Sequence, residues 1–205
     1  GTFDGKAGNV PTVAKFAMIG DRLDAVVDAH DATGRDAGLL VTEVTIEAEL
    51  KIHAEAHGDL PHIDTKANIS LGRATIDATA GIDTGPKTRI KGQVAVRNFN
   101  AAAIQKTAPK TEIGLDANAD IEIADDGPHG KASVDTLPGF VENQKIPKVE
   151  VRADVAGKSG KATVTIPDPQ LKTKVDIAMT PHGADGQTIA AIVESRIPDL
   201  HRVPY

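Results

Sequence analysis

Polar and apolar residues alternate with a period of two over most of this chain. From Leu40 to Ala56 the even positions read Leu, Thr, Val, Ile, Ala, Leu, Ile, Ala, Ala, and the odd positions include four glutamates, a lysine and a histidine. Successive side chains of a β-strand point to opposite faces, whereas a helix needs apolar residues three and four apart. The run therefore predicts a strand with one apolar face, which we call the dry face, and one polar face exposed to water. At about 3.3 Å per residue it would span on the order of 50 Å, so we expect it to be bent or split.

The same alternation returns along the rest of the chain, which predicts ten to twelve strands of an antiparallel all-β fold. The apolar phase changes next to Gly72, which indicates a β-bulge, and GKSG at 157–160 indicates a hairpin turn. One short helix is expected after Asn100, and 187–195 fits either a strand or a helix. The further alternating runs are 63–71, 74–82, 90–96, 113–123, 149–155, 162–166 and 173–179.

Composition excludes several classes of protein. With 23 basic and 29 acidic residues and a net charge of -6, the chain has no basic patch for a nucleic acid. The absence of cysteine excludes disulfides, zinc–thiolate sites and thiol catalysis. No apolar run approaches the roughly 18 residues of a transmembrane helix. The chain begins GTFDG, and we expect residues 1–205 to be a single β-rich segment of a larger chain.

The dry face of such a sheet has to be covered, and the chain offers no long amphipathic helix to cover it. A second sheet, closure into a barrel, or a curled sheet with an apolar groove would each solve this problem. Aromatic residues make up only 2% of the chain, so few bulky side chains are present to fill the inner face. The long alternating runs therefore favour a curved antiparallel sheet around a hydrophobic groove, with a closed β-sandwich as the alternative.

The stretch from Gly92 to Ile123 reads GQVAVRNFNAAAIQKTAPKTEIGLDANADIEI. It contains an alternating strand, the pair Asn98-Phe99, an alanine-rich link and a second alternating strand. In these features it resembles repeats of the AsmA-like superfamily, particularly TamB-type proteins of Gram-negative bacteria. The resemblance implies a sheet folded like a taco (a β-taco) around a hydrophobic groove. It also implies a periplasmic location and an inner-membrane anchor outside this segment. Other parts of the parent chain would contact an outer-membrane barrel, and the role would be phospholipid transport or outer-membrane assembly.

The stretch HAEAHGDLPH at 53–62 is rich in histidine, but its periodicity argues against a metal site. On a strand, His53 and His57 lie about 13 Å apart, and zinc–nitrogen bonds are only about 2.0–2.1 Å long. We expect both histidines to face water, while Ala54 and Ala56 continue the dry face. Further along, D-x-N-x-D at 116–120 imitates a calcium loop, but Ile121 stands where that loop needs glycine. We therefore predict neither a metal site nor a cofactor.

No catalytic motif is present either. GKSGK at 157–161 lacks the first glycine and the final Ser or Thr of a phosphate-binding loop, because Val155 and Ala162 occupy those positions. There is no G-x-S-x-G element, and nothing selects two carboxylates as an acid–base pair. The chain is therefore predicted not to be an enzyme.

The hypothesis that follows is a lipid-binding and lipid-conducting groove, with phospholipid acyl chains as the partner. The alternative is a structural or adhesive β-sandwich segment of a bacterial surface protein that binds no small ligand. The residues expected to line the groove are the larger aliphatic residues of the dry face: Val44, Ile46, Leu50, Ile52, Ile69, Leu71, Ile76, Val94, Val96, Ile113, Leu115, Ile121, Ile123, Val149, Val151, Val155, Val164, Ile166, Val175 and Ile177.

Overall fold

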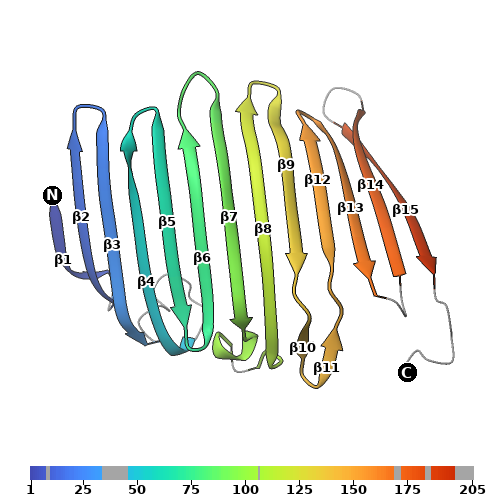
Figure 1. Cartoon of the computed structure of the whole chain (residues 1–205), viewed down its shortest axis with the longest axis horizontal. Coiled ribbons are helices and arrows are strands. Elements are labelled where there is room, and N and C mark those ends of the chain that lie inside the picture. The colour runs from blue at the N-terminus through green and yellow to red at the C-terminus, as the bar shows by residue number, and fades with distance from the viewer. Residues whose placement is uncertain (8–9, 34–45, 106, 169–171, 183–185, 197–205) are drawn as a thin grey trace.

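The computed structural model describes residues 1–7, 10–33, 46–105, 107–168, 172–182 and 186–196, and nearly all of them lie in one antiparallel sheet (Figure 1). Thirteen strands follow one another in the order β1 to β9 and then β12 to β15. The strands and the single 3₁₀ turn are β1 (Thr2–Ala7), β2 (Val10–Ile19), β3 (Arg22–Thr33), β4 (Ile46–Asp59), β5 (His62–Leu71), β6 (Ala74–Asp83), β7 (Thr88–Phe99), η1 (Ala101–Ala103), β8 (Thr111–Ala124), β9 (Gly127–Thr136), β10 (Gly139–Val141), β11 (Gln144–Ile146), β12 (Glu150–Ala156), β13 (Ser159–Pro167), β14 (Lys172–His182) and β15 (Gly186–Arg196).

The prediction of an all-β fold built on a long, curved antiparallel sheet is confirmed. The outer strands β1 and β15 do not pair with each other, so the sheet is open. The short β10–β11 hairpin lies between β9 and β12 in the chain, and β10 pairs with the first two residues of β8. The alternative of a closed β-sandwich is not found in the described residues, because no second sheet packs on the first. The described part of the chain contains no helix long and apolar enough to cross a membrane.

The strand registers place most of the apolar residues of the sheet on one face. Residues directly opposite each other in an antiparallel pair share a face, so the registers can be followed from strand to strand. One such row is apolar at every position, and it consists of Val27, Ala54, Ala67, Ala78, Val94, Ala117, Val134, Val151, Val164, Val175 and Val193. We call this side the apolar face and the opposite side the charged face.

The β-bulge expected at Gly72 is wrong. Leu71 pairs with Ala74, and Gly72 (φ +59°) and Arg73 form a two-residue turn that reverses the chain between β5 and β6. The phase changes there because a two-residue hairpin pairs an odd position with an even one. Glycine suits the turn because it adopts positive φ without a steric penalty.

A bulge does occur in β7, where the register shifts between Val96 and Phe99. Asn98 has φ +52°, a left-handed conformation that asparagine tolerates better than most residues. Arg97 and Asn98 together oppose Gly114, and the extra residue changes the phase of the strand. Phe99 consequently pairs with Ile113 and returns to the apolar face.

Most other local predictions are confirmed. The GKSG turn joins β12 to β13, and residues 187–195 lie within strand β15. Asn100 accepts a hydrogen bond from the backbone N–H of Ala102 and caps η1, which is shorter than the expected helix. The split expected in the run from Leu40 to Ala56 is not found in its described part, because β4 is one continuous strand from Ile46 to Asp59. Residues 40–45 of that run lie outside the described residues.

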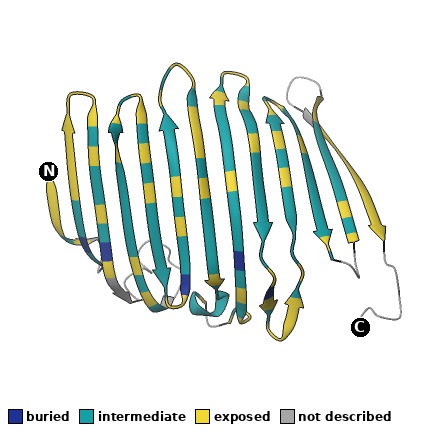
Figure 2. Ribbon diagram, in the orientation of Figure 1, coloured by how far each residue is buried: buried dark blue, intermediate teal, exposed yellow. Residues whose placement is uncertain are grey.

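The sheet has almost no closed core. Among the described residues, only Val10, Ala29 and Ala74 are buried apolar side chains (Figure 2). The accessible surface of the chain is 13728 Å², whereas a compact protein of 21.4 kDa exposes roughly 9,100 Å². Much of the apolar face is therefore only half buried, by its own neighbours in the sheet.

Candidate functional site: the apolar face

The registers bring the predicted groove residues together on the apolar face, although they come from eight different strands. Val149 directly precedes β12, where its backbone N–H donates to the Thr136 hydroxyl (2.7 Å). Ile46 is the first residue of β4, and Val44 lies outside the described residues. The predicted residues that the partner pairs place on this face are Leu50, Ile52, Ile69, Leu71, Ile76, Val94, Val96, Ile113, Leu115, Ile121, Ile123, Val151, Val155, Val164, Ile166, Val175 and Ile177.

A shallow hollow of about 610 Å³ lies in the middle of the apolar face. It is lined by residues of β3 to β9. Its floor is formed by two neighbouring rows of mostly small residues that cross the strands and continue beyond the hollow to β13, and we call these two rows the alanine trough. The first row is the one that runs from Val27 to Val164. The second row consists of Ala25, Ala56, Thr65, Ala80, Gly92, Ala119, Ala132, Ala153 and Ala162.

Larger aliphatic side chains border the alanine trough on both sides. They are Ile63, Ile82, Ile90 and Ile121 along one margin, and Ile52, Ile69, Ile76, Val96 and Leu115 along the other. Neighbouring strands are about 4.8 Å apart, so the trough extends for about 38 Å across the nine strands from β3 to β13. The predicted groove residues include the second margin and Ile121 of the first, but they miss Ile63, Ile82 and Ile90, and the course of the trough across the strands depends on the registers. Ala54 and Ala56, predicted to continue the dry face, do lie in its floor.

Gly92 leaves the centre of the trough without a side chain in its floor. A β-carbon at this position would lie 2.8 Å from the carbonyl oxygen of Thr79 and 3.0 Å from the Cβ of Ala80. Both distances are shorter than ordinary van der Waals contact. Glycine therefore allows β6 and β7 to approach each other without a side chain in the floor of the trough.

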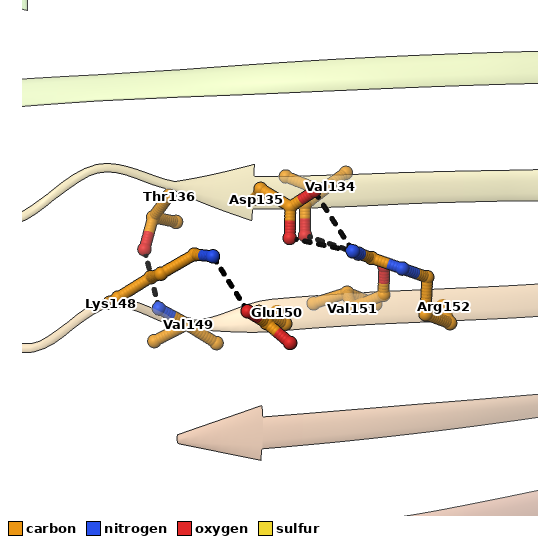
Figure 3. Close-up of polar contacts among 8 residues, drawn as sticks. All are labelled: Val134, Asp135, Thr136, Lys148, Val149, Glu150, Val151 and Arg152. Atoms are coloured by element: carbon orange, nitrogen blue, oxygen red, sulfur yellow. Dashed lines mark hydrogen bonds and ion pairs between the residues drawn. The ribbon is translucent and has the colours of Figure 1, made fainter. Parts of the chain in front are cut away.

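The charged face is covered by ion pairs between neighbouring strands. Arg89 holds Asp120 through two hydrogen bonds of 2.8 Å, and Arg152 contacts both oxygens of Asp135 at 2.8 and 2.9 Å (Figure 3). The hydrogen bond from Arg89 lowers the pKa of Asp120 below its usual range. Exposed pairs of this kind contribute little stability individually. Their main consequence is that this face, unlike the other, is fully compatible with water.

The histidines of the HAEAH stretch belong to the charged face, as predicted. His53 Nδ1 lies 2.6 Å from Asp28 Oδ1, and its Nε2 lies 3.7 Å from Glu55 Oε2. The hydrogen bond to Asp28 is the main reason that the pKa of His53 is raised. His57 is exposed and lies opposite Asp64 in the register of β4 and β5. Within the described residues, no group of three or more histidine or acidic side chains is arranged to hold a metal ion.

The D-x-N-x-D stretch of β8 is also explained by strand alternation, because Asp116, Asn118 and Asp120 all lie on the charged face. The two carboxylates are occupied by arginines from β7, with Arg97 2.6 Å from Asp116.

The charged face has a hollow of its own, of about 890 Å³, directly behind the alanine trough. It is larger, but Lys91, Lys131 and Lys161 alternate there with Asp120 and Asp154. Charges of both signs in alternation select neither an anionic nor a cationic ligand. The apolar face is therefore the stronger candidate for a functional surface.

Comparisons with known proteins find no matching family model, no matching curated protein and no solved structure of matching fold. The fold of the chain is an open, single-layer antiparallel β-sheet with one apolar face and one charged face.

Proposed function

We propose that the apolar face binds the acyl chains of phospholipids and conducts them along the alanine trough. In this proposal the chain is a segment of a periplasmic, TamB-type protein of the AsmA-like superfamily, which transports phospholipid between the inner and outer membranes. The inner-membrane anchor and the contact with an outer-membrane barrel belong to other parts of the parent chain. The observation that carries the proposal is an apolar face, continuous across the sheet, that no described element covers.

The dimensions of the alanine trough suit an acyl chain. An acyl chain spans about half of the roughly 30 Å hydrocarbon core of a bilayer, so a trough of about 38 Å accommodates its whole length with room to move. Each CH₂ group removed from water contributes about 0.8 kcal/mol. Binding needs no hydrogen bond, which agrees with a floor built of alanine, valine and glycine.

The uniformity of the floor favours movement along it. Each strand contributes similar small residues every 4.8 Å or so, so an acyl chain that shifts by one strand exchanges one set of contacts for an equivalent set. The polar side chain of the floor, Thr65, already donates its hydroxyl to the carbonyl oxygen of Ala80 (3.0 Å), so it needs no partner from the acyl chain during such a shift. Sliding therefore costs little free energy compared with leaving the trough for water.

The test places a bulky side chain in the centre of the trough. Ala119→Trp fills the floor between Ile121 on one margin and Leu115 on the other. The matched control is Asn118→Trp, because Asn118 is the preceding residue of the same strand and lies exposed on the charged face. Native mass spectrometry measures bound phosphatidylethanolamine, and a fluorescent phosphatidylethanolamine reports transfer between vesicles of phosphatidylethanolamine and phosphatidylglycerol.

We expect the unaltered protein and the Asn118→Trp control to carry lipid and to accelerate transfer. Ala119→Trp should slow transfer at least about tenfold while retaining much of the bound lipid, because the trough stays open on both sides of the block. A protein that purifies without lipid and takes none from vesicles would contradict the proposal. Equal transfer by the two tryptophan variants would contradict the path along the trough.

A further inference from the structure

The two outer strands of the sheet differ in how they are protected. Outer strands of soluble proteins are usually short or carry charges, because their free N–H and C=O groups otherwise recruit another strand. Strand β1 fits this rule because it carries Asp4 and Lys6. Strand β15 has eleven residues, and its centre, Ile189–Val193, is the apolar run Ile-Ala-Ala-Ile-Val.

Strand β15 is also the place where the alternation between the two faces breaks down. Ile192 pairs with Asp176 and so lies on the charged face, where it is 64% exposed. On the apolar face, Ile189 and Val193 are 70% and 66% exposed. A continuous apolar run is typical of a strand that is covered on both faces and flanked on both edges, rather than of a free edge. No described residue pairs with the outer edge of β15.

We propose that a second copy of this chain pairs with β15 in an antiparallel, two-fold arrangement in which Ala191 lies opposite Ala191 of the partner. The apolar run is centred on Ala191, so this register places Ile189 opposite the partner's Val193 and Ala190 opposite the partner's Ile192. The polar Thr188 lies opposite Glu194 beyond the run. A shift by two residues in either direction would place an isoleucine or a valine opposite a serine or a glutamine.

The faces of the sheet select the same register. A shift by one residue would put the apolar faces of the two copies on opposite sides of the joined sheet. With Ala191 on the two-fold axis, the apolar faces lie on the same side and continue across the junction. Ala191 pairs with Ile177, which follows Ala162 in the small-residue row, so the axis lies on the extension of the alanine trough.

The arrangement closes on itself. An isologous contact uses the same edge of both copies, so no second β15 edge is left over to recruit a third copy. Pairing through one strand edge buries less than the roughly 1,200 Å² of a standard interface. We therefore expect a dimer that dissociates in the micromolar range rather than a permanent one.

Single cysteines test the register directly, because the chain contains no cysteine. Directly opposite residues have Cα atoms about 4.5–5.5 Å apart, which is within the range of a disulfide, so Ala191→Cys should form a covalent dimer under mild oxidation. Thr188→Cys is the control, since residue 188 of the partner would lie about 20 Å away along the strand. Failure of Ala191→Cys to cross-link, or equal cross-linking of both variants, would overturn the proposal.

Light scattering coupled to gel filtration tests which surface forms the dimer. The wild-type protein should move from 21.4 kDa toward about twice that mass as its concentration rises to about 200 µM. Ile192→Lys should stay monomeric, because it replaces the apolar contact with the partner's Ala190 and places two lysines diagonally across the junction on the same face, whereas in the monomer the new lysine lies opposite Asp176. Thr180→Lys, on the same face of β14, should dimerise like the wild type. A monomeric wild type overturns the proposal, and so does a dimer that survives Ile192→Lys, which would point to contact between the apolar faces.

Discussion

At the scale of single residues, the charged face carries a series of local ion pairs. The pair that His53 forms can be followed through the pKa of its imidazole. Its side chain is 43% exposed and bridges from β4 to Asp28 on β3. The hydrogen bond to Asp28 raises the pKa of His53, with a smaller contribution from Glu55. The imidazolium is thus favoured in the folded chain without any metal or catalytic partner.

We predict that His53 titrates above the ordinary histidine pKa of about 6.5 when it is followed by NMR. Asp28→Asn should bring the pKa back toward that value, and Glu55→Gln should lower it less. Since the folded state raises the pKa, the pair stabilises the fold fully below pH 6.5 and loses its effect as the pH rises through the raised pKa. Because the pair is exposed, the contribution is about a few tenths of a kcal/mol. A His53 titration that Asp28→Asn leaves unchanged would show that the contact is not populated in solution.

At the scale of the elements, the bulge in β7 decides which residues reach the apolar face beyond Val96. Without the extra residue, Phe99 would project from the charged face. Gly114, opposite the bulge, is buried, and a β-carbon there would lie 3.0 Å from Leu137 Cδ1 and 3.1 Å from the carbonyl oxygen of Val96. The bulge and the glycine thus form one tightly fitted unit.

We predict that Asn98→Val destabilises the fold by about 1–3 kcal/mol, because a β-branched residue is strained at positive φ. Asn98→Gly should be neutral within about 0.5 kcal/mol, since glycine adopts this conformation freely. Urea unfolding followed by circular dichroism measures both. If Asn98→Val were as stable as the wild type, the register shift between β7 and β8 would have to be reconsidered.

At the scale of the whole molecule, the open single layer makes the protein larger than its mass suggests. A compact domain of 205 residues has a radius of gyration of about 17 Å. A plate of thirteen strands, each about 40 Å long and 4.8 Å from its neighbours, has one of about 20 Å.

Small-angle scattering of the monomer should therefore give a radius of gyration near 20 Å and a distance distribution with a long tail. The Ile192→Lys variant provides a monomeric sample, because the change removes the self-complementary edge of β15. A value near 17 Å would mean that the sheet closes on itself in solution as a sandwich, and the apolar face would then be a core rather than a binding surface.

The sequence by itself determined the fold class, the separation of apolar and charged residues, and the absence of recognisable catalytic motifs. These follow from a period of two, which is a local property of each strand and can be counted from the residues. It also determined that His53 and His57 lie on the face exposed to water, and that Ala54 and Ala56 belong to the apolar face.

Only the tertiary structure decided how these local patterns combine. The phase change at Gly72 reads equally as a bulge or as a reversal of the chain, and hydrogen bonding between β5 and β6 selects the reversal. The alanine trough runs across the strands, so its residues are far apart in sequence and meet only through the registers. The same holds for the edges, because the position of β1 and β15 at the two ends of the sheet depends on strand order, which no local pattern encodes.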